Sequence, residues 1–399
     1  MIDSAVTAAG PGAPEAERIR EAFRALRRAE FPWTAERIYL NNAGVGPLPE
    51  RTRRVMDDLN ARRTAPYLLG ERELRSILSA ARSAAARLIN AEVDEIALAP
   101  NTSFGLNLAA GALPVEPGER ILISDREFPA NVYPWLRLKE RGIEVELAPT
   151  TPEGWPNEEY LLEKLEDPSV RVLAVSLVQF ASGYRVDLAR LSTACRANGT
   201  YLVVDAIQGL GQVPLDVSRT PVDILACGGQ KWLLAPWGSG FLYVRRELIP
   251  MLEPVVVGWM AFEGTEDFTA LTRYDTTLRR DARRFEVGTM AVQDFAGMTE
   301  SLNLLLELGI ERIAAWLKEL REPLYRLAAE GKLRLASPTD AVHQSAIVCV
   351  AADNLAETYH RLKKSQVDCV MREGTIRLSP HFYNIPEEME KVAGILAQG

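Results

Sequence analysis

The sequence predicts an α/β protein, with a mainly parallel sheet that has helices on both faces and a smaller α+β C-terminal domain. Between residues 95 and 245, short apolar segments bounded by turn residues alternate with helical patterns. Such alternation is typical of parallel sheets, because each helix returns the chain to the edge at which the next strand begins. After about residue 286, two long helical patterns, short strands and a closing helix replace this rhythm.

The expected elements of the first part follow in order. A charged amphipathic helix at 15–30 precedes a short strand, the Gly/Pro loop "NNAGVGPLP" and a long helix. The expected strands of the large sheet are "EIALAP", "RILISD", "IEVELAP", "VRVLAVSLV", "TYLVVDA", "VDILACG" and "SGFLYVR". Helices between several of these strands are expected at "TSFGLNLAAGAL", "ANVYPWLRLKERG" and "DLARLSTACRANG".

The C-terminal part is expected to begin with helices at about 291–308 and 310–331. Strands at "SAIVCVA", "VDCVM" and "TIRLS" follow, and "PEEMEKVAGILA" forms a closing helix. In "VDCVM" a period of two places Val367, Cys369 and Met371 on one face of a strand.

Length and charge restrict the class of protein. The chain has 399 residues, 47% hydrophobic and 25% charged, which is long enough for two domains around a large core. Its net charge of -8 argues against a protein that binds nucleic acid through the phosphate backbone. The N-terminal segment lacks the basic region of a signal peptide, and no apolar run predicts a membrane span. We expect residues 1–14 to be a frayed tail.

The cysteines and histidines restrict the class of protein further. The four cysteines lie far apart with no CxxC pair, which indicates reduced thiols in a cytoplasmic protein. The three histidines form no metal-ligand spacing with them, so we expect no metal site.

One lysine lies in an apolar, glycine-rich stretch, "CGGQKWLLAPWGSG", with no carboxylate nearby in sequence. Burying an ammonium group without a partner costs several kcal/mol or lowers its pKa. Two interpretations of Lys231 follow. Its side chain reaches water from the end of a strand, or its amine is part of a Schiff base.

Two further motifs lie at the ends of expected strands. In "YLVVDAIQGLGQVPLDV" an apolar strand ends on Asp205, at the edge where α/β proteins bind ligands, although the carboxylate could also cap the following turn. In "LAPNTSFGLNLAAG" a helix begins near Thr102 and Ser103, which suits a phosphate but also suits ordinary capping. Neither a dinucleotide fingerprint nor a P-loop is present.

Together, these parts are what pyridoxal 5'-phosphate (PLP) requires. A lysine forms the Schiff base, a carboxylate keeps the pyridine nitrogen protonated, and a helix N-terminus holds the phosphate. From "YLNNAGVGPLP" to "IRLSPHFYN" the chain resembles the class V aminotransferases of PLP fold type I, a group that includes cysteine desulfurases and kynureninase. The pair "VVDAIQ" and "GGQKW" carries this resemblance most specifically, and it identifies Lys231 as the expected cofactor lysine and Asp205 as the expected partner of the pyridine nitrogen.

The resemblance implies roles for other cofactor residues. Ser103 and the amide of Phe104 correspond to phosphate ligands, and Phe128 in "EFPANVYPW" corresponds to the aromatic side chain that stacks on the ring. Gln208 is similar to the residue that faces the ring's phenolic oxygen. Gln230 lies where relatives place a phosphate-binding side chain beside the lysine.

The resemblance also implies a partner and a substrate. Thr289 in "RRFEVGTMAV" corresponds to a threonine that reaches the phosphate of the neighbouring subunit, so a homodimer with shared sites is expected. Arg377 in "TIRLSPHFYN" corresponds to the arginine that holds the substrate α-carboxylate. The expected domains are 1–40, a tail and a helix that packs on the small domain; 41–286, the large PLP-binding domain; and 287–399, the small domain.

Three positions depart from the desulfurase pattern. Cys369 lies in an apolar strand-like run rather than on a long mobile loop, so we expect a buried thiol. Phe180 occupies the position of an asparagine near the ring, and Gly228 replaces a phosphate-binding serine.

These observations lead to an expected PLP enzyme that acts on a small amino acid through an external aldimine, with Lys231 and Asp205 as catalytic residues. The reaction is expected to be transamination or a related reaction at Cα or Cβ. A C–S lyase with cysteine desulfurase- or selenocysteine lyase-like activity is the alternative, and a non-catalytic PLP-binding protein is a remote one.

Overall fold

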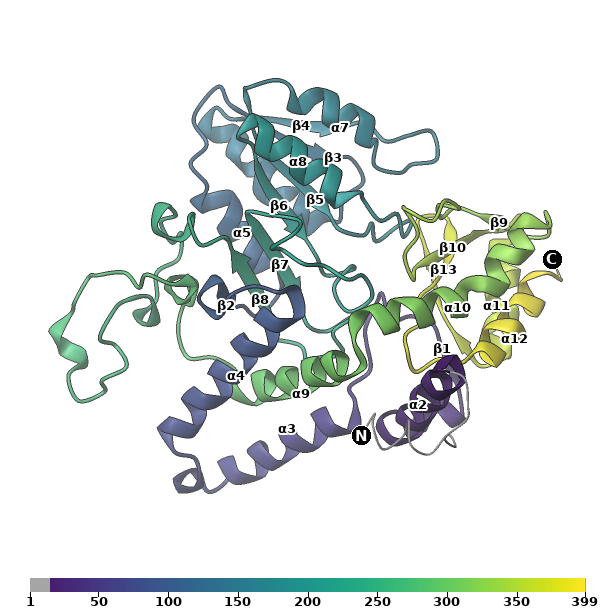
Figure 1. The fold of residues 1–399 in the computed structure, drawn as a ribbon, viewed down its shortest axis with the longest axis horizontal. Coiled ribbons are helices and arrows are strands. Elements are labelled where there is room, and N and C mark those ends of the chain that lie inside the picture. The colour runs from purple at the N-terminus through teal and green to yellow at the C-terminus, as the bar shows by residue number, and fades with distance from the viewer. Residues whose placement is uncertain (1–14, 399) are drawn as a thin grey trace.

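The computed structural model describes residues 15–398, so the tail expected at 1–14 lies outside the described part (Figure 1). Its centre is a seven-stranded sheet in the order β2-β8-β7-β6-β5-β3-β4. Only β8 runs against the other strands, which confirms the mainly parallel sheet. The strands are β2 (Ile96–Leu98), β3 (Arg120–Ser124), β4 (Glu144–Ala148), β5 (Val170–Ser176), β6 (Tyr201–Asp205), β7 (Ile224–Gly228) and β8 (Gly240–Val244).

Alternating side chains of these strands enter two separate cores, one on each face of the sheet. Along β6, Val203 joins the core on one face, while Leu202 and Val204 join the core on the other. The first face is covered by α5 (Thr102–Ala112) and α6 (Tyr133–Leu136). The second is covered by α4 (Glu71–Ile89), α7 (Glu158–Leu165) and α8 (Leu188–Asn198). Both faces are therefore buried, as the near-continuous apolar strands require.

Helix α9 (Val292–Leu308) packs along α3 (Glu50–Arg63) and α4, and Figure 1 shows these helices beside the lower edge of the sheet. Helix α10 (Ile310–Ala329) then leads the chain to the C-terminal part. Both long helices lie where the sequence predicts them.

The C-terminal part contains a four-stranded antiparallel sheet in the order β12-β13-β10-β9. A short parallel pair joins β1 to β11, so the segment before the Gly/Pro loop returns to this part of the chain. These α and β elements confirm the smaller α+β unit. They are β1 (Ile38–Tyr39), β9 (Arg334–Leu335), β10 (Val348–Ala351), α11 (Leu355–Lys364), β11 (Val367–Asp368), β12 (Val370–Arg372), β13 (Thr375–Leu378) and α12 (Pro386–Leu396).

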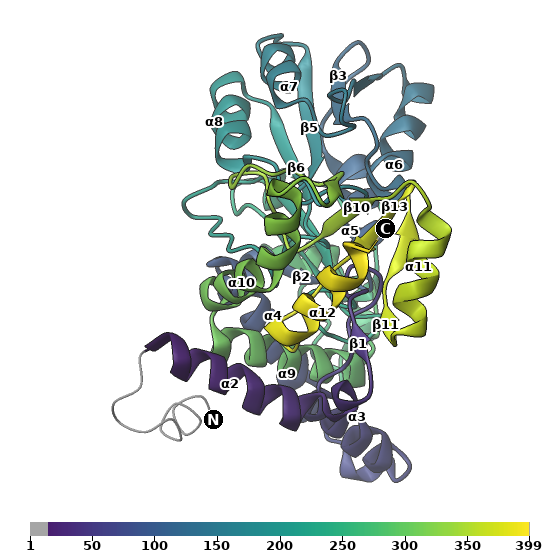
Figure 2. The same cartoon turned by 90° about the vertical axis from the view of Figure 1, so that its right-hand side faces the viewer.

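The N-terminal helix α2 (Glu15–Glu30) lies across α10 and α12, as Figure 2 shows from the side. The ring of Phe23 stacks on Trp316 of α10 with centroids 5.1 Å apart. Arg24 forms an ion pair with Glu387 of α12 at 2.6 Å. The amphipathic pattern of residues 15–30 therefore covers apolar surface of the C-terminal part.

The structure corrects the predicted strand at "VDCVM". The chain changes sheets at Cys369, because β11 pairs with β1 while β12 pairs with β13. Val367 and Cys369 are buried, but Met371 is 45% exposed, so the three side chains do not share a face. A second difference lies in "ANVYPWLRLKERG", where α6 has only four residues and is flanked by the 3-10 turns η4 (Pro129–Asn131) and η5 (Arg137–Arg141).

Within residues 15–398, each helix is too short or too polar to cross a membrane.

Candidate active site

The candidate site lies at the carboxyl ends of β5, β6 and β7, the edge at which parallel sheets bind ligands. Asp205 ends β6 and is 2% exposed, and its Oδ1 accepts a hydrogen bond from Ile207 N at 3.1 Å. Burial raises the pKa of Asp205 to about 6, while the Ile207 amide and the charge of Lys231 act in the opposite direction. A buried carboxylate of this kind gains stability from a cationic partner.

Lys231 lies in the loop that follows β7. This loop packs closely on the Gly/Pro loop, since Gly46 N donates to Gln230 O at 2.8 Å and a Cβ on Gly46 would lie 2.1 Å from Lys231 O. Leu234 adopts a left-handed backbone with φ 54° in the same loop. Burial lowers the pKa of Lys231 to about 8; Asp205 opposes this shift and Arg377 adds to it. The amine is therefore neutral over a range in which an exposed lysine is charged.

Arg377 approaches from β13 of the C-terminal sheet and is 2% exposed. Its Nη1 donates to Phe180 O at 2.8 Å, but its Nε is buried with no acceptor among the described residues. Burial lowers the pKa of Arg377 to about 10. Because a buried guanidinium without a counter-ion is costly, the site favours an anionic ligand at this position.

Two phenylalanines connect the lysine to the arginine. The ring of Phe128 lies 5.6 Å from Lys231 Nζ, and Phe180 packs edge-on against Phe128 with ring centroids 5.3 Å apart. Phe128 is 41% exposed, which leaves part of its ring surface available to a planar ligand. The ring of Phe180, which replaces the asparagine of the desulfurase pattern, therefore packs on Phe128, while the backbone carbonyl of the same residue holds the Arg377 guanidinium.

The expected phosphate end lies at the N-terminus of α5. Asn101 caps this helix by accepting a hydrogen bond from Phe104 N at 2.9 Å, so the amide expected to bind phosphate is engaged by a side chain. Ser103 is exposed in the first turn. Thr102 Oγ1 accepts from Gly228 N at 2.9 Å and joins the helix to the end of β7. The positive end of the helix and these hydroxyls suit an anion.

Gly228 makes room for Gln230 at this end. A Cβ at position 228 would lie 2.6 Å from Gln230 Oε1 and 3.2 Å from Thr102 Oγ1. The desulfurase pattern has a serine at position 228. In this chain the Gln230 side chain fills the space that the serine side chain would occupy.

Gln208 lies between the Gly/Pro loop and the lysine loop. Its Nε2 donates to Ala43 O at 3.0 Å, and its Oε1 accepts from Trp232 Nε1 at 2.8 Å. The second N–H of this amide has no partner among the described residues, so a ring oxygen could accept from it.

Thr289 does not join this cluster within one chain. It is exposed and lines a separate cavity of about 350 Å³ together with Arg63, Leu69 and Leu74.

Sequence reasoning missed Glu127, which is buried beside the cluster. Its carboxyl accepts hydrogen bonds from Ser176 N at 2.8 Å, from the Ser176 hydroxyl and from Gln179 Nε2 at 2.9 Å. Ser176 is the register partner of Asp205, so Glu127 fixes the strand end next to the Asp205 carboxylate. Burial raises the pKa of Glu127 to about 7, although hydrogen bonds from Ser176 act in the opposite direction. The position of Glu127 directly before Phe128 was the sequence signal that could have identified it.

The residues present fit PLP. A buried acid suits the pyridine nitrogen, a lysine with a lowered pKa suits the aldehyde, and a helix N-terminus suits the phosphate. The Nε of Arg377 remains without a partner among the described residues and suits an anionic group.

Comparison with known proteins agrees with this geometry. Residues 38–392 match the family model Aminotransferase class-V. An uncharacterised aminotransferase of Bacillus subtilis, YcbU, is 34% identical over 309 residues, which cover 77% of this chain and 80% of that protein. A probable cysteine desulfurase of Methanothermobacter thermautotrophicus is 28% identical and covers 93% of this chain and 96% of its own.

A solved structure of C-DES, with glycine covalently linked to its PLP cofactor, has the same fold. The TM-score is 0.82 at 23% identity, and the match covers 93% of this chain and 98% of the other. The fold is thus PLP fold type I. The chain belongs to the class V aminotransferase family, and the protein is a PLP-dependent enzyme.

Proposed function

We propose that the enzyme acts on a small amino acid, in transamination or a related reaction at its Cα or Cβ. The observation that carries this proposal is the buried, unpaired guanidinium of Arg377 at the same site as the low-pKa amine of Lys231. A guanidinium binds a carboxylate through paired hydrogen bonds, which would place the α-carbon of an amino acid near that amine.

The chain's own residues divide the chemistry between them. When bound, PLP supplies an electron sink that stabilises negative charge at the α-carbon of the substrate. Asp205 would pair with the ring nitrogen and keep it protonated, because a nearby opposite charge favours the charged form. Lys231 would hold the cofactor covalently at Nζ and, once released, take or return a proton there. Arg377 would orient the substrate carboxylate throughout.

Cleavage of a C–S bond is the second candidate, since one relative carries the name cysteine desulfurase. All four cysteines are buried and free. Burial raises the pKa of each thiol, to about 12 for Cys369. A nucleophilic thiolate is therefore disfavoured, and C–S cleavage in this enzyme would proceed by elimination with Lys231 as base. The presence of Lys231, Asp205 and Arg377 together argues against a non-catalytic PLP-binding role.

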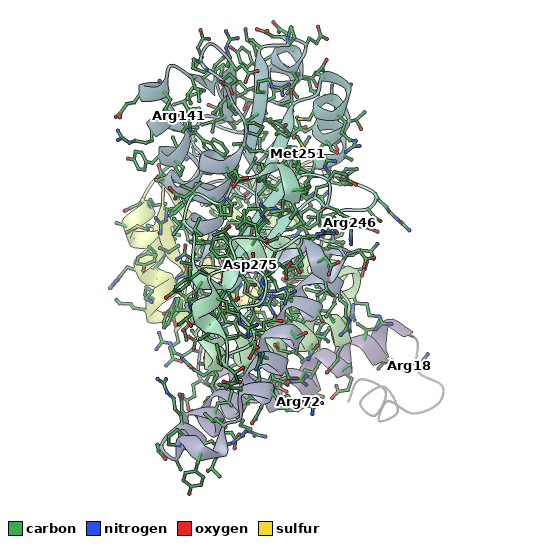
Figure 3. The ribbon with its side chains drawn as sticks, turned by 90° about the vertical axis from the view of Figure 1, so that its left-hand side faces the viewer. Arg18, Arg72, Arg141, Arg246, Met251 and Asp275 are labelled. Atoms are coloured by element: carbon green, nitrogen blue, oxygen red, sulfur yellow. The ribbon has the colours of Figure 1, made fainter. Side chains whose placement is uncertain are left out.

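A homodimer with shared sites is part of the proposal. A segment between residues 251 and 281 extends away from the body at the left of Figure 1 and exposes apolar side chains. Figure 3, which looks onto this side, labels Met251 at its start and Asp275 near its end. The exposed residues include Val255, Val256, Val257, Trp259 and Phe268. Such a surface supports contact with a second copy, into whose site Thr289 would reach.

We also place the enzyme in the cytoplasm, away from membranes and nucleic acid. The four free cysteines and the net charge of -8 support this assignment.

The test incubates the PLP-loaded enzyme with each small amino acid and detects keto acid, pyridoxamine phosphate, pyruvate and sulfide. Keto acid with pyridoxamine phosphate supports transamination, and pyruvate with sulfide from cysteine supports elimination. Arg377→Lys should raise the KM about 10- to 100-fold, since hydrogen bonds to charged groups contribute about 1.5–3 kcal/mol. An unchanged KM for every amino acid that reacts would refute Arg377 as the carboxylate ligand.

The shared site has its own test. Mixing the inactive variants Lys231→Ala and Thr289→Asp should restore part of the activity, because some mixed dimers contain one intact site. A PLP-loaded protein that is active and strictly monomeric by light scattering would exclude the dimer.

A further inference from the structure

A cavity of about 250 Å³ lies where α10 meets the loop before β10 and the segment that follows Gln208. Figure 1 shows α10 leading from α9 to the C-terminal sheet. The residues that line the cavity are far apart in sequence, from Arg185 to Ala346. The polar and charged residues that line it are Arg185, Gln212, Lys318, Arg321, Gln344 and Ser345.

All charged side chains that line this cavity are cationic. Arg185 lies in the segment between β5 and α8. Lys318 and Arg321 lie three residues apart, on one face of α10. In the part of the chain that the structure describes, none of the three forms an ion pair with a carboxylate. Like charges in a partly enclosed space repel more strongly than in open water, so the arrangement favours an anion.

Arg321 has unused donor capacity. It is 8% exposed and donates from Nη1 to Ser345 O, while its Nε is buried with no acceptor among residues 15–398. Burial lowers the pKa of Arg321, Tyr325 opposes this shift, and the charge of Arg185 adds to it. A buried arginine with an unpartnered Nε also occurs at Arg377 and at Arg284, so it is the position of Arg321 in the wall of a cationic cavity that points to a ligand.

Arg185 is fixed in place on the opposite wall. Its Nε donates to Val342 O at 2.8 Å, which ties its guanidinium to the loop before β10. Asp187 and Asp340 raise the pKa of Arg185, but burial lowers it more, and neither carboxylate lines the cavity.

We propose that this cavity, the α10 anion site, binds a small polyanion of the phosphate class. Its volume is below that of pockets for drug-sized ligands, which suits a compact anion. Guanidinium groups match phosphate oxygens in pairs, and the exposed Lys318 supplies a further charge at the rim. The anion would hold α10 against the large sheet, beside Gln212, whose Nε2 donates to Gln208 O at 2.5 Å next to the active site.

The test titrates the PLP-loaded enzyme by calorimetry with inorganic pyrophosphate and, separately, with glycerol 3-phosphate. One saturating site is expected in the wild type. Tighter binding of pyrophosphate would indicate a free polyphosphate as the ligand, and tighter binding of glycerol 3-phosphate would indicate a phosphate ester. Lys318→Ala should weaken binding at least about tenfold, since one charged contact contributes about 1.5–3 kcal/mol. Arg321→Gln should abolish it. Arg312→Ala, which removes a cation from the same helix away from the cavity, should bind like the wild type.

The active site is the competing location for a phosphate. In the holoenzyme PLP occupies the phosphate end of the active site, so Arg377 is the cation there that a probe could still bind. Arg377→Lys is therefore the control for binding of the probe in the active site. Binding that survives Arg377→Lys and weakens in Lys318→Ala supports the α10 anion site even if Arg321→Gln fails to fold. Binding that is lost in Arg377→Lys and unchanged in Lys318→Ala, or no binding of either probe, overturns the proposal.

Discussion

Lys231 and Arg377 reach one site from different sheets, and no carboxylate forms an ion pair with either of them within residues 15–398. Burial is the main reason that the pKa of Lys231 falls to about 8; Asp205 opposes this effect, and the charge of Arg377 adds to it. We propose that the arginine serves two purposes. It would provide the donors for a substrate carboxylate, and its charge adds to the effect of burial that favours the neutral form of Lys231.

This relationship predicts the pH dependence of cofactor capture. Only the neutral amine of Lys231 can attack the aldehyde of PLP, so the rate constant for reconstitution of the apoenzyme should rise with pH and level off above about 8. Stopped-flow absorbance after mixing apoenzyme with PLP measures this rate. A midpoint near 10.5, the ordinary lysine value, would contradict the assignment.

Two variants serve as controls for that midpoint. Arg377→Met removes a positive charge and should move it to higher pH, whereas Asp205→Asn removes a negative charge and should move it to lower pH. Shifts in the same direction for both variants would show that the two charges do not act on Lys231.

Asp205→Asn should bind PLP and lose most of its activity. The neutral amide cannot keep the ring nitrogen protonated, and each pKa unit of lost support corresponds to about 1.36 kcal/mol. Two such units predict a kcat lower by about 100-fold. Steady-state kinetics on the preferred amino acid, with PLP content checked by absorbance, measures the loss. A kcat near the wild-type value would exclude the role given to Asp205.

Residues at strand ends were the predictable part of the site. Asp205 is the last residue of one apolar strand and Lys231 lies three residues after the end of the next, and parallel strands bring their carboxyl ends to one edge. Arg377 could be assigned only through the family resemblance, because β13 belongs to another sheet and pattern does not reveal how two sheets meet.

Burial and local competition for hydrogen bonds could not be predicted. Glu127 resembles an ordinary surface acid in "DREFPAN" until the fold encloses it beside Ser176. The amide of Phe104 was expected to bind phosphate, but the structure shows it capped by Asn101, a choice that sequence alone does not decide. The strand expected through Cys369 divides because two sheets pair with its two halves.

Gly228→Ser should weaken PLP binding rather than improve it. The new Cβ would lie 2.6 Å from Gln230 Oε1, so the glutamine would have to leave its place beside the phosphate end. The end of the glutamine is flexible and moves aside at little packing cost, so the loss is that of the contact proposed for it with the phosphate; one hydrogen bond to a charged group contributes about 1.5–3 kcal/mol, which predicts a Kd for PLP higher by about tenfold or more. Gly394→Ser, at a position with nothing within 4 Å, is the matched control. Tighter PLP binding in Gly228→Ser would show that the serine restores a phosphate contact.

Cys369→Ala should retain most of the activity. The thiol is 5% exposed, burial raises its pKa to about 12, and it lies where the chain passes from one sheet to another. Such a sulfur cannot act as a mobile nucleophile, so its loss should leave only a small void and lower the free energy of unfolding by about 1 kcal/mol. Turnover, urea denaturation and persulfide detection after incubation with cysteine are the measurements. A stoichiometric persulfide on Cys369 that disappears together with activity in Cys369→Ala would establish a thiol-dependent desulfurase instead.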